Sequence, residues 1–200
     1  MVTSRNITTL LITLSIFFIP VLRGAGATEK MEQQERMVLD FSRAEGRESW
    51  YIINDGVMGG ISRSKITFSE SGTALFQGTV SLENNGGFAS TRSAPRSYKL
   101  GGYSGLLLQI RGDGRDYQFR LRTDGRFDTI SYRYRFTTQP DTVQTIRALF
   151  TEFEPVFRGR VLADAAPLSP ENIQQLGFLI ADGQSGPFRI EIDWIKAFNE

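Results

Sequence analysis

Short runs of alternating apolar and polar residues, bounded by turn-forming residues, are the feature that most constrains the fold of this chain. From about Met37 to Phe198 these runs are rich in Phe, Tyr, Ile, Val and Thr, and clusters of Gly, Asn, Asp and Pro separate them. Because successive side chains of a strand point to opposite faces of a sheet, this period of two predicts half-buried strands. We expect strands over residues 37–41, 50–53, 64–68, 74–82, 87–92, 105–111, 117–122, 129–136, 142–148, 177–181 and 188–195. This pattern predicts an all-β fold, either a two-sheet β-sandwich or a jelly roll.

One short helix is expected in addition, over residues 170–176. Ser169 can cap its start, Pro170 suits the first helical position, and Gly177 can end the helix after Leu176. A single helix of this length can pack against a sheet, but it cannot supply the crossovers that a parallel sheet needs.

The N-terminus is typical of a targeting segment. Arg5 precedes an apolar run over residues 10–22, and Ala25-Gly26-Ala27 follows as a small-x-small cleavage pattern, so residues 1–27 are predicted to be a signal peptide. Residues 28–36 are polar and form a predicted tether to a domain over 37–198. The apolar run is shorter than the roughly 20 residues that span a bilayer, so we expect no stable membrane span after cleavage. The expected location is exported, periplasmic or extracellular, and the alternative is mitochondrial.

Two residue types are missing from the whole sequence, histidine and cysteine. Their absence excludes Ser-His-Asp and Cys-His catalysis, zinc sites with the usual ligands, and disulfides. Lys and Arg number 23 against 22 Asp and Glu, so no overall field favours nucleic acid as a partner. We predict no catalytic residue, cofactor or metal ligand, although carboxylate pairs such as Asp40 with Asp193, or Asp182 with Asp55, could hold Ca²⁺ through oxygen.

Four arginines are predicted to gather on one sheet face. In the 117–122 strand the apolar residues alternate with Arg120 and Arg122, and in the 129–136 strand they alternate with Arg133 and Arg135. Like charges on neighbouring strands repel, so something must balance them. One interpretation is pairing with the acidic face of the 188–195 strand, where Glu191 and Asp193 alternate with Phe188, Ile190, Ile192 and Trp194. The other is an anion-binding surface, because guanidinium groups bind carboxylate and phosphate bidentately.

Two glycine-rich loops are also candidate binding elements. Residues 54–60 read NDGVMGG and contain Asn54 and Asp55, while residues 83–87 read ENNGG and contain Asn84 and Asn85. Turn geometry alone explains such loops, and neither matches the spacing of a phosphate-binding loop. Trp50, just before the first loop, could stack on a sugar ring or belong to the core.

Four segments carry a resemblance to a known family: WYIINDGVMGGIS (50–62), VSLENNGGFAS (80–90), RGDGRDYQFRLRTD (111–124) and LSPENIQQLGFLIADGQSGPFRIEIDWIKAF (168–198). In this order they resemble the complex I intermediate-associated protein 30 family, across nearly all of 37–198. The resemblance implies a galactose-binding-like β-sandwich or jelly roll, a fold shared with many carbohydrate-binding modules. It also implies an assembly factor for respiratory complex I in the mitochondrial matrix, without established catalytic residues. The predicted signal peptide departs from that location.

The function that we expect is therefore that of a non-catalytic binding module. The first hypothesis is an assembly or chaperone-like factor that holds a protein partner. The alternative is an exported module that binds a carbohydrate or an anionic ligand, and a third hypothesis is a glycan-active enzyme that uses two carboxylates. The candidate binding residues are Arg120, Arg122, Arg133, Arg135, Trp50, Asn54, Asp55, Asn84 and Asn85.

Overall fold

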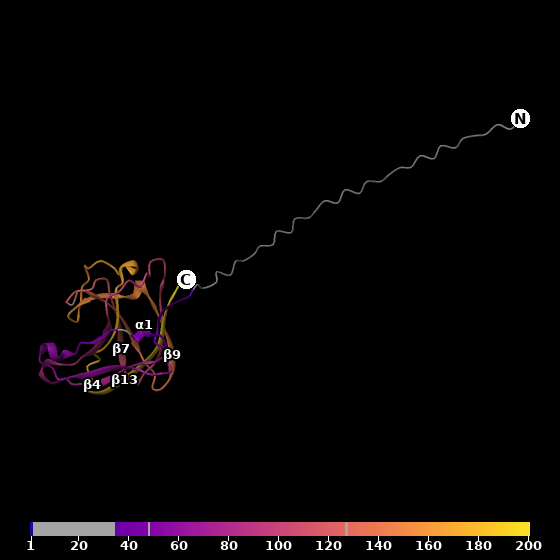
Figure 1. Cartoon of the computed structure of the whole chain (residues 1–200). Coiled ribbons are helices and arrows are strands. Elements are labelled where there is room, and N and C mark those ends of the chain that lie inside the picture. The colour runs from indigo at the N-terminus through magenta and orange to yellow at the C-terminus, as the bar shows by residue number, and fades with distance from the viewer. Residues whose placement is uncertain (2–34, 48, 127) are drawn as a thin grey trace. The chain divides into compact units, whose positions relative to one another are not determined.

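Two antiparallel sheets make up the fold (Figure 1). The computed structural model describes Met1 and residues 35–47, 49–126 and 128–200. The predicted signal peptide after Met1, and the tether up to residue 34, lie outside the described residues. No helix in the described part of the chain combines the length and the apolar character needed to cross a membrane.

The first sheet has six strands in the order β3-β4-β13-β6-β9, with β1 also paired to β13. The long strand β13 pairs with β4 through its first half and with β1 through its second half, while β6 lies along its other side. The strands are β1 (Arg36–Asp40), β3 (Arg63–Phe68), β4 (Ala74–Val80), β6 (Gly105–Arg111), β9 (Val143–Leu149) and β13 (Gly186–Phe198).

The second sheet has seven strands in the order β11-β10-β8-β7-β12-β5-β2. They are β2 (Trp50–Ile52), β5 (Ala89–Ser93), β7 (Asp116–Arg122), β8 (Ser131–Thr137), β10 (Glu154–Phe157), β11 (Arg160–Val161) and β12 (Gln175–Ile180). The helical elements are one turn each: α1 (Ala44–Arg47), η1 (Asp55–Met58), η2 (Glu83–Asn85), η3 (Phe150–Glu152) and η4 (Pro170–Asn172).

One cluster of buried side chains from both sheets fills the space between them. Phe188 of the first sheet contacts Tyr117 of the second, with ring centroids 6.5 Å apart, and Phe76 packs on Phe188 at 4.9 Å. On β7 the buried residues Tyr117, Phe119 and Leu121 alternate with polar ones, as the period of two predicted. The predicted fold class, a β-sandwich, is confirmed.

The predicted helix over 170–176 is wrong. Only η4 is helical, and Gln175 and Leu176 already belong to β12, which pairs with β5 and β7 on its two sides. Gln174 extends this ladder, because its backbone N–H donates to the carbonyl of Arg122 at 2.8 Å. Hydrogen bonds to two neighbouring strands outweigh the local capping signals at this position.

A β-bulge changes the face on which Trp194 lies. Ile192 pairs with Ile110 and Trp194 pairs with Gln109, so Asp193 is an extra residue in β13. The shift puts Ile195 on the core side and leaves Trp194 only half-buried, under the ammonium group of Lys196 at 4.6 Å. The expected face of Phe188, Ile190, Ile192 and Trp194 therefore ends at Ile192.

Strand β1 begins one residue before the range expected for the domain. Arg36 was assigned to the tether, yet it starts β1, and its guanidinium donates to the carbonyls of Tyr98 at 2.8 Å and Lys99 at 3.0 Å.

Candidate ligand-binding cleft

A cleft of about 660 Å³ lies on the seven-stranded sheet, over strands β5, β12, β7 and β8. Its floor includes Arg120 and Arg122, which alternate along β7 with the core residues Phe119 and Leu121. The floor therefore faces away from the core. Six arginines line the cleft, namely Arg92, Arg120, Arg122, Arg133, Arg135 and Arg158, and Asp128 is the only acidic residue among the described lining residues.

The antiparallel register brings the four predicted arginines together. Arg120 of β7 lies directly opposite Arg133 of β8, and Gln118 lies opposite Arg135. Arg120 is held in place by Gln118, whose Oε1 accepts from its Nε at 3.0 Å, and by Ser131, whose Oγ accepts from its Nη1 at 2.8 Å. These contacts are neutral, so they orient the guanidinium without cancelling its charge.

Only part of this positive charge is balanced within the protein. Arg133 is buried and pairs with Glu154 at 2.6 Å, and Arg158 pairs with Asp128. Within the described residues, Arg120, Arg122 and Arg135 form no ion pair with a carboxylate. The predicted pairing with Glu191 and Asp193 is wrong, because β13 belongs to the other sheet. There Glu191 pairs with Arg111 and Arg189, and Asp193 accepts a hydrogen bond from Thr73.

The electrostatic consequence is an unfavourable environment for the charged guanidinium groups. Burial, followed by the charges of Arg133, Arg122 and Arg135, lowers the pKa of Arg120 from 12.5 to about 9. Burial and the neighbouring Arg92 lower the pKa of Arg122 to about 10, against the weaker opposing effect of Asp124 and Asp128. An uncompensated cation in such a site favours the binding of an anion.

One buried polar side chain, that of Gln175, lies beneath the cleft. Gln175 is 4% exposed, and its Nε2 donates to the carbonyl of Ser93 at 2.9 Å, while its Oε1 has no hydrogen-bond partner within the described residues. Gln175 pairs with Arg122 across the β12–β7 ladder, so its side chain lies on the cleft side of the sheet. Buried polar groups are nearly always hydrogen-bonded, so the Oε1 of Gln175 is an exception beneath the arginine floor.

The arrangement can bind an oxyanion. A guanidinium carries five N–H donors in a planar fork that matches carboxylate and phosphate oxygens. Within the described residues, Arg122 uses one of these donors, from Nη1 to the carbonyl of Thr129 at 2.8 Å. Arg92 and Arg158 were not among the predicted site residues. The outward position of Arg92 could have been found from the alternation of β5, whereas Arg158 follows the unpredicted strand β10.

The other five predicted site residues are not among the described residues that line this cleft. Asn54 accepts hydrogen bonds through its Oδ1 from Ser64 and Ser90, and Asn84 and Asn85 sit in η2 with positive φ angles of 54° and 59°. Trp50 packs against Phe41 at 5.8 Å, and its indole N–H donates to the carbonyl of Gly46.

Asp55 joins the two predicted loops. Its side chain is fully buried and accepts hydrogen bonds from the backbone N–H groups of Ser62 at 2.9 Å, Gly87 at 2.8 Å and Phe88 at 3.3 Å, and from the Ser62 hydroxyl. Burial raises the pKa of this carboxyl, but the hydrogen bonds outweigh burial and hold the pKa below its usual value.

The carboxylate pairs that could have held Ca²⁺ are engaged elsewhere. Asp182 forms a two-pronged ion pair with Arg115, at 2.6 and 2.8 Å, and Asp55 faces backbone donors. Asp40 accepts from Ser42, and Asp193 accepts from Thr73. The described part of the chain contains no group of three or more carboxylates that could hold a metal ion.

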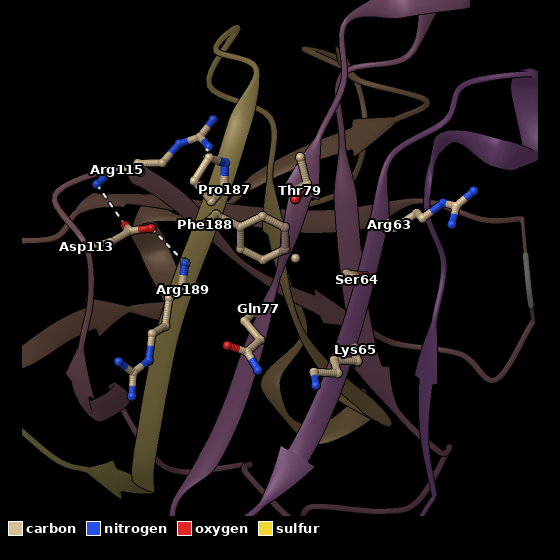
Figure 2. A pocket seen from close by; sticks show the side chains of 11 residues that line it. Arg63, Ser64, Lys65, Gln77, Thr79, Asp113, Arg115, Pro187, Phe188 and Arg189 are labelled. Atoms are coloured by element: carbon tan, nitrogen blue, oxygen red, sulfur yellow. Dashed lines mark hydrogen bonds between the residues drawn. The ribbon is translucent and has the colours of Figure 1, made fainter.

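A second hollow, of about 770 Å³, lies over β3, β4 and β13 (Figure 2). Asp113 anchors one side of it by accepting from the backbone N–H groups of Arg115 at 3.1 Å and Arg189 at 2.7 Å. Figure 2 shows the guanidinium groups of Arg63 and Arg189 at opposite sides of the view, so they do not converge on one point. The arginine-lined cleft is therefore the better candidate site.

Comparison with known proteins decides the family. The sequence pattern of the complex I intermediate-associated protein 30 family matches residues 39–192. The chain belongs to this family. A mouse member described as mitochondrial is 30% identical over 198 residues, and the alignment covers 88% of this chain and 60% of the mouse protein. A mitochondrial member from Drosophila melanogaster is 28% identical, with 80% and 61% covered. The chain thus spans about 60% of the length of these relatives.

Solved structures show the same fold in other proteins. A family 11 carbohydrate-binding module of a Clostridium thermocellum cellulase superposes with a TM-score of 0.62 at 19% identity, covering 84% of this chain and 95% of the module. The same kind of module has been solved with a β-1,3-1,4-mixed-linked tetrasaccharide, and it superposes with a TM-score of 0.62 at 20% identity. At this level of identity the likeness shows the fold alone. The galactose-binding-like β-sandwich that the family resemblance implied is confirmed.

Proposed function

We propose that this member of the complex I intermediate-associated protein 30 family is a non-catalytic binding protein that holds a protein partner during assembly of respiratory complex I. In this proposal the arginine-lined cleft receives an acidic surface of the partner. One observation carries the proposal: Arg120, Arg122 and Arg135 converge on one cleft without a carboxylate partner among the described residues. Such a group is stabilised when an external carboxylate enters.

The family relatives support the assembly role and its location. The mouse and Drosophila proteins are named as complex I intermediate-associated and mitochondrial. These names favour the mitochondrial alternative and give no support to export. Residues 1–28 contain Arg5 and Arg23 but no Asp or Glu, and an acid-poor, basic segment is compatible with mitochondrial import.

The experiment that tests this proposal is capture of the partner from a mitochondrial extract. The full chain, tagged at its C-terminus, is compared with the double variant Arg120→Gln/Arg122→Gln. Because hydrogen bonds to charged groups contribute about 1.5–3 kcal/mol each, we expect recovery of complex I subunits to fall about tenfold or more. Raising the salt concentration should lower recovery by the wild type in the same direction.

A matched control removes two positive charges elsewhere. Arg63 and Lys65 are exposed on β3 of the other sheet, so Arg63→Gln/Lys65→Gln changes the net charge equally without touching the cleft. This control should retain wild-type recovery. Equal recovery by the wild type and the cleft variant would contradict the proposal, and so would equal losses in both double variants.

A carbohydrate ligand is the second candidate function, and the shared fold with a family 11 carbohydrate-binding module favours it. The lining of the cleft does not favour it, because sugar sites stack the ring on exposed aromatic faces. The aromatic lining residues are Phe88 and the buried Phe178, and no Trp or Tyr occurs among the described lining residues. Affinity electrophoresis in a mixed-linked β-glucan gel tests this candidate, and retardation that survives Arg120→Gln/Arg122→Gln would support it over the first.

Catalysis on a glycan is disfavoured by the same lining. Glycoside hydrolysis uses two carboxyl groups across the scissile bond. Asp128 is the single acid among the described lining residues, and it is paired with Arg158.

A further inference from the structure

We infer that the segment held in the cleft combines carboxylates with an adjacent apolar side chain, and that Ile53, Val57 and Met58 form the surface on which this apolar side chain packs. The inference rests on the proposed function, and it specifies the chemistry of the partner segment. These three residues, called the apolar rim below, line the same cleft as Arg120 and Arg122.

The apolar rim is strongly exposed to solvent. Val57 is 67% exposed and Met58 is 59% exposed, although both are large apolar side chains. Covering exposed apolar surface contributes about 25 cal/mol of favourable free energy per Å². Methionine adapts its shape to irregular partners, so Met58 suits contact with a side chain of a peptide. The cleft thus offers an arginine floor and an apolar edge together.

The rim is preformed rather than assembled on binding. Val57 and Met58 belong to η1, which begins at the buried Asp55, and this carboxylate ties η1 to the segment that contains Gly87 and Phe88. Asp55 is therefore a positioning residue for the rim. A surface that is already ordered loses little conformational entropy when the partner binds.

Two glycines permit this arrangement. A Cβ at Gly60 would lie 2.4 Å from the Asp55 carboxyl carbon, and one at Gly86 would lie 2.7 Å from its Oδ2. Gly59, which precedes Gly60 and follows η1, has a φ of 92°, which disfavours any other residue. The sequence NDGVMGG is therefore shaped to bring the backbone against Asp55 and to leave Val57 and Met58 at the surface.

The combination favours a peptide over a free phosphate. Phosphate or pyrophosphate would contact the arginines and leave the apolar rim exposed, whereas a segment with both kinds of side chain covers the two surfaces at once. The six arginines and one aspartate that line the cleft give it a strong positive charge, so the complementary segment is acidic.

The inference is tested on the full-length protein with two labelled peptides and one unlabelled competitor. The peptides are Glu-Leu-Glu-Leu-Glu and Glu-Ser-Glu-Ser-Glu, and the competitor is inorganic pyrophosphate, whose own binding is measured by calorimetry. We expect fluorescence polarisation to show about tenfold tighter binding of the leucine peptide, which corresponds to burial of roughly one apolar side chain.

Variants of the two surfaces separate their contributions. Val57→Ser/Met58→Ser should reduce the preference for the leucine peptide to within about twofold while leaving binding dependent on salt. Arg120→Gln/Arg122→Gln should abolish binding of both peptides. Met58→Gln alone is a milder rim variant, and a thermal melt of each protein verifies that it is folded.

The outcomes distinguish the inference from the proposed function. If the wild type binds both peptides equally, or if the rim variants keep the preference, the inference about the rim is wrong while the role of the arginines stands. If pyrophosphate binds and neither peptide does, the inference is wrong and the cleft serves a phosphate ligand. Loss of partner capture in the arginine variant, measured separately, still decides the proposed function.

Discussion

Replacing Arg120 with methionine should make the protein more stable while weakening its binding of the partner. This side chain lies opposite Arg133 across the β7–β8 pair, close to Arg122 and Arg135, and it forms no ion pair with a described carboxylate. Methionine keeps an unbranched stem of similar length and removes the charge. The expected gain follows from the charges and not from improved packing, which makes the prediction specific to the cleft.

The magnitude can be worked from the environment of the guanidinium. A pKa that falls from 12.5 to about 9 corresponds to on the order of 5 kcal/mol of unfavourable free energy for the charged form in the folded state. The variant also loses the hydrogen bonds to Gln118 and Ser131, which contribute about 1 kcal/mol each. Solvent in the open cleft screens part of the repulsion. We therefore expect a net stabilisation of about 2 kcal/mol, or roughly 4–8 °C in the melting temperature.

The assay is urea unfolding followed by tryptophan fluorescence, in chloride buffer without phosphate. The pH dependence has a definite sign. Because the pKa of Arg120 is lower in the folded state than in the unfolded state, its unfavourable contribution is fully present below about pH 9 and is relieved as the pH rises from about 9 towards 12.5. The stability difference between the variant and the wild type should be constant from pH 6 to 8 and decrease above pH 9.

The reasoning would be refuted if Arg120→Met were as stable as the wild type, or less stable, at pH 7. A difference that stayed unchanged up to pH 10.5 would refute the electrostatic explanation even if the variant were more stable. Addition of 10 mM pyrophosphate supplies a further check, because an anion that binds the folded cleft should raise the melting temperature of the wild type more than that of the variant.

Three other substitutions test the loops and the sheets. Asp55→Asn should lower the free energy of unfolding by about 3 kcal/mol at pH 7, because an amide cannot accept from all the donors around it. The pKa of Asp55 in the folded protein lies below 3.8, so the difference in stability between variant and wild type should shrink as the pH falls below 3.8. Asp182→Asn breaks the buried ion pair with Arg115 and should lower the free energy of unfolding by about 3 kcal/mol, measured by urea titration. An unchanged urea midpoint would contradict a structural role for this ion pair. In Gly78→Ala the new Cβ would lie 2.1 Å from the Arg63 carbonyl, so hydrogen exchange should accelerate in β3, and unchanged protection would show that the strands can shift.

The alternation in the sequence was sufficient to predict the arginine cluster. Phe119 and Leu121 are buried, while Arg120 and Arg122 lie on the opposite face of β7, as the period of two requires. The turn between residues 122 and 131 made β7 and β8 neighbours, so the register followed from local chemistry. These are properties of adjacent strands, and adjacent strands are where a sequence carries most information about pairing.

Membership of a sheet could not be predicted in the same way. β13 alternates as the other strands do, and nothing in its residues distinguishes one sheet from the other, so Glu191 was expected near the arginines although it lies on the opposite layer. The bulge at Asp193 was equally hidden, because it depends on the pairing with β6. The helix expected near Pro170 failed for a related reason: contacts with β5 and β7 decide the conformation of Gln175.

The strand β10 was not predicted from the sequence. It contains Pro155, which has no N–H to donate to a neighbouring strand, and a proline usually argues against a strand. It is tolerated next to the short outermost strand β11, and there it brings Glu154 to Arg133 and precedes Arg158. Arg158 was therefore absent from the predicted site because it follows an atypical strand.

The arginine-lined cleft and the hollow of Figure 2 carry positive charge in different ways. Around the hollow of Figure 2, Arg63 and Lys65 extend from an exposed strand, where water solvates each charge separately and folding is little affected. In the cleft, Arg120 and Arg122 are brought together and partly buried, so their charges oppose folding. A chain that needed only a stable sandwich would place neutral side chains on this face. Local features that oppose folding are typical of functional sites, because the unfavourable energy is relieved when the ligand binds.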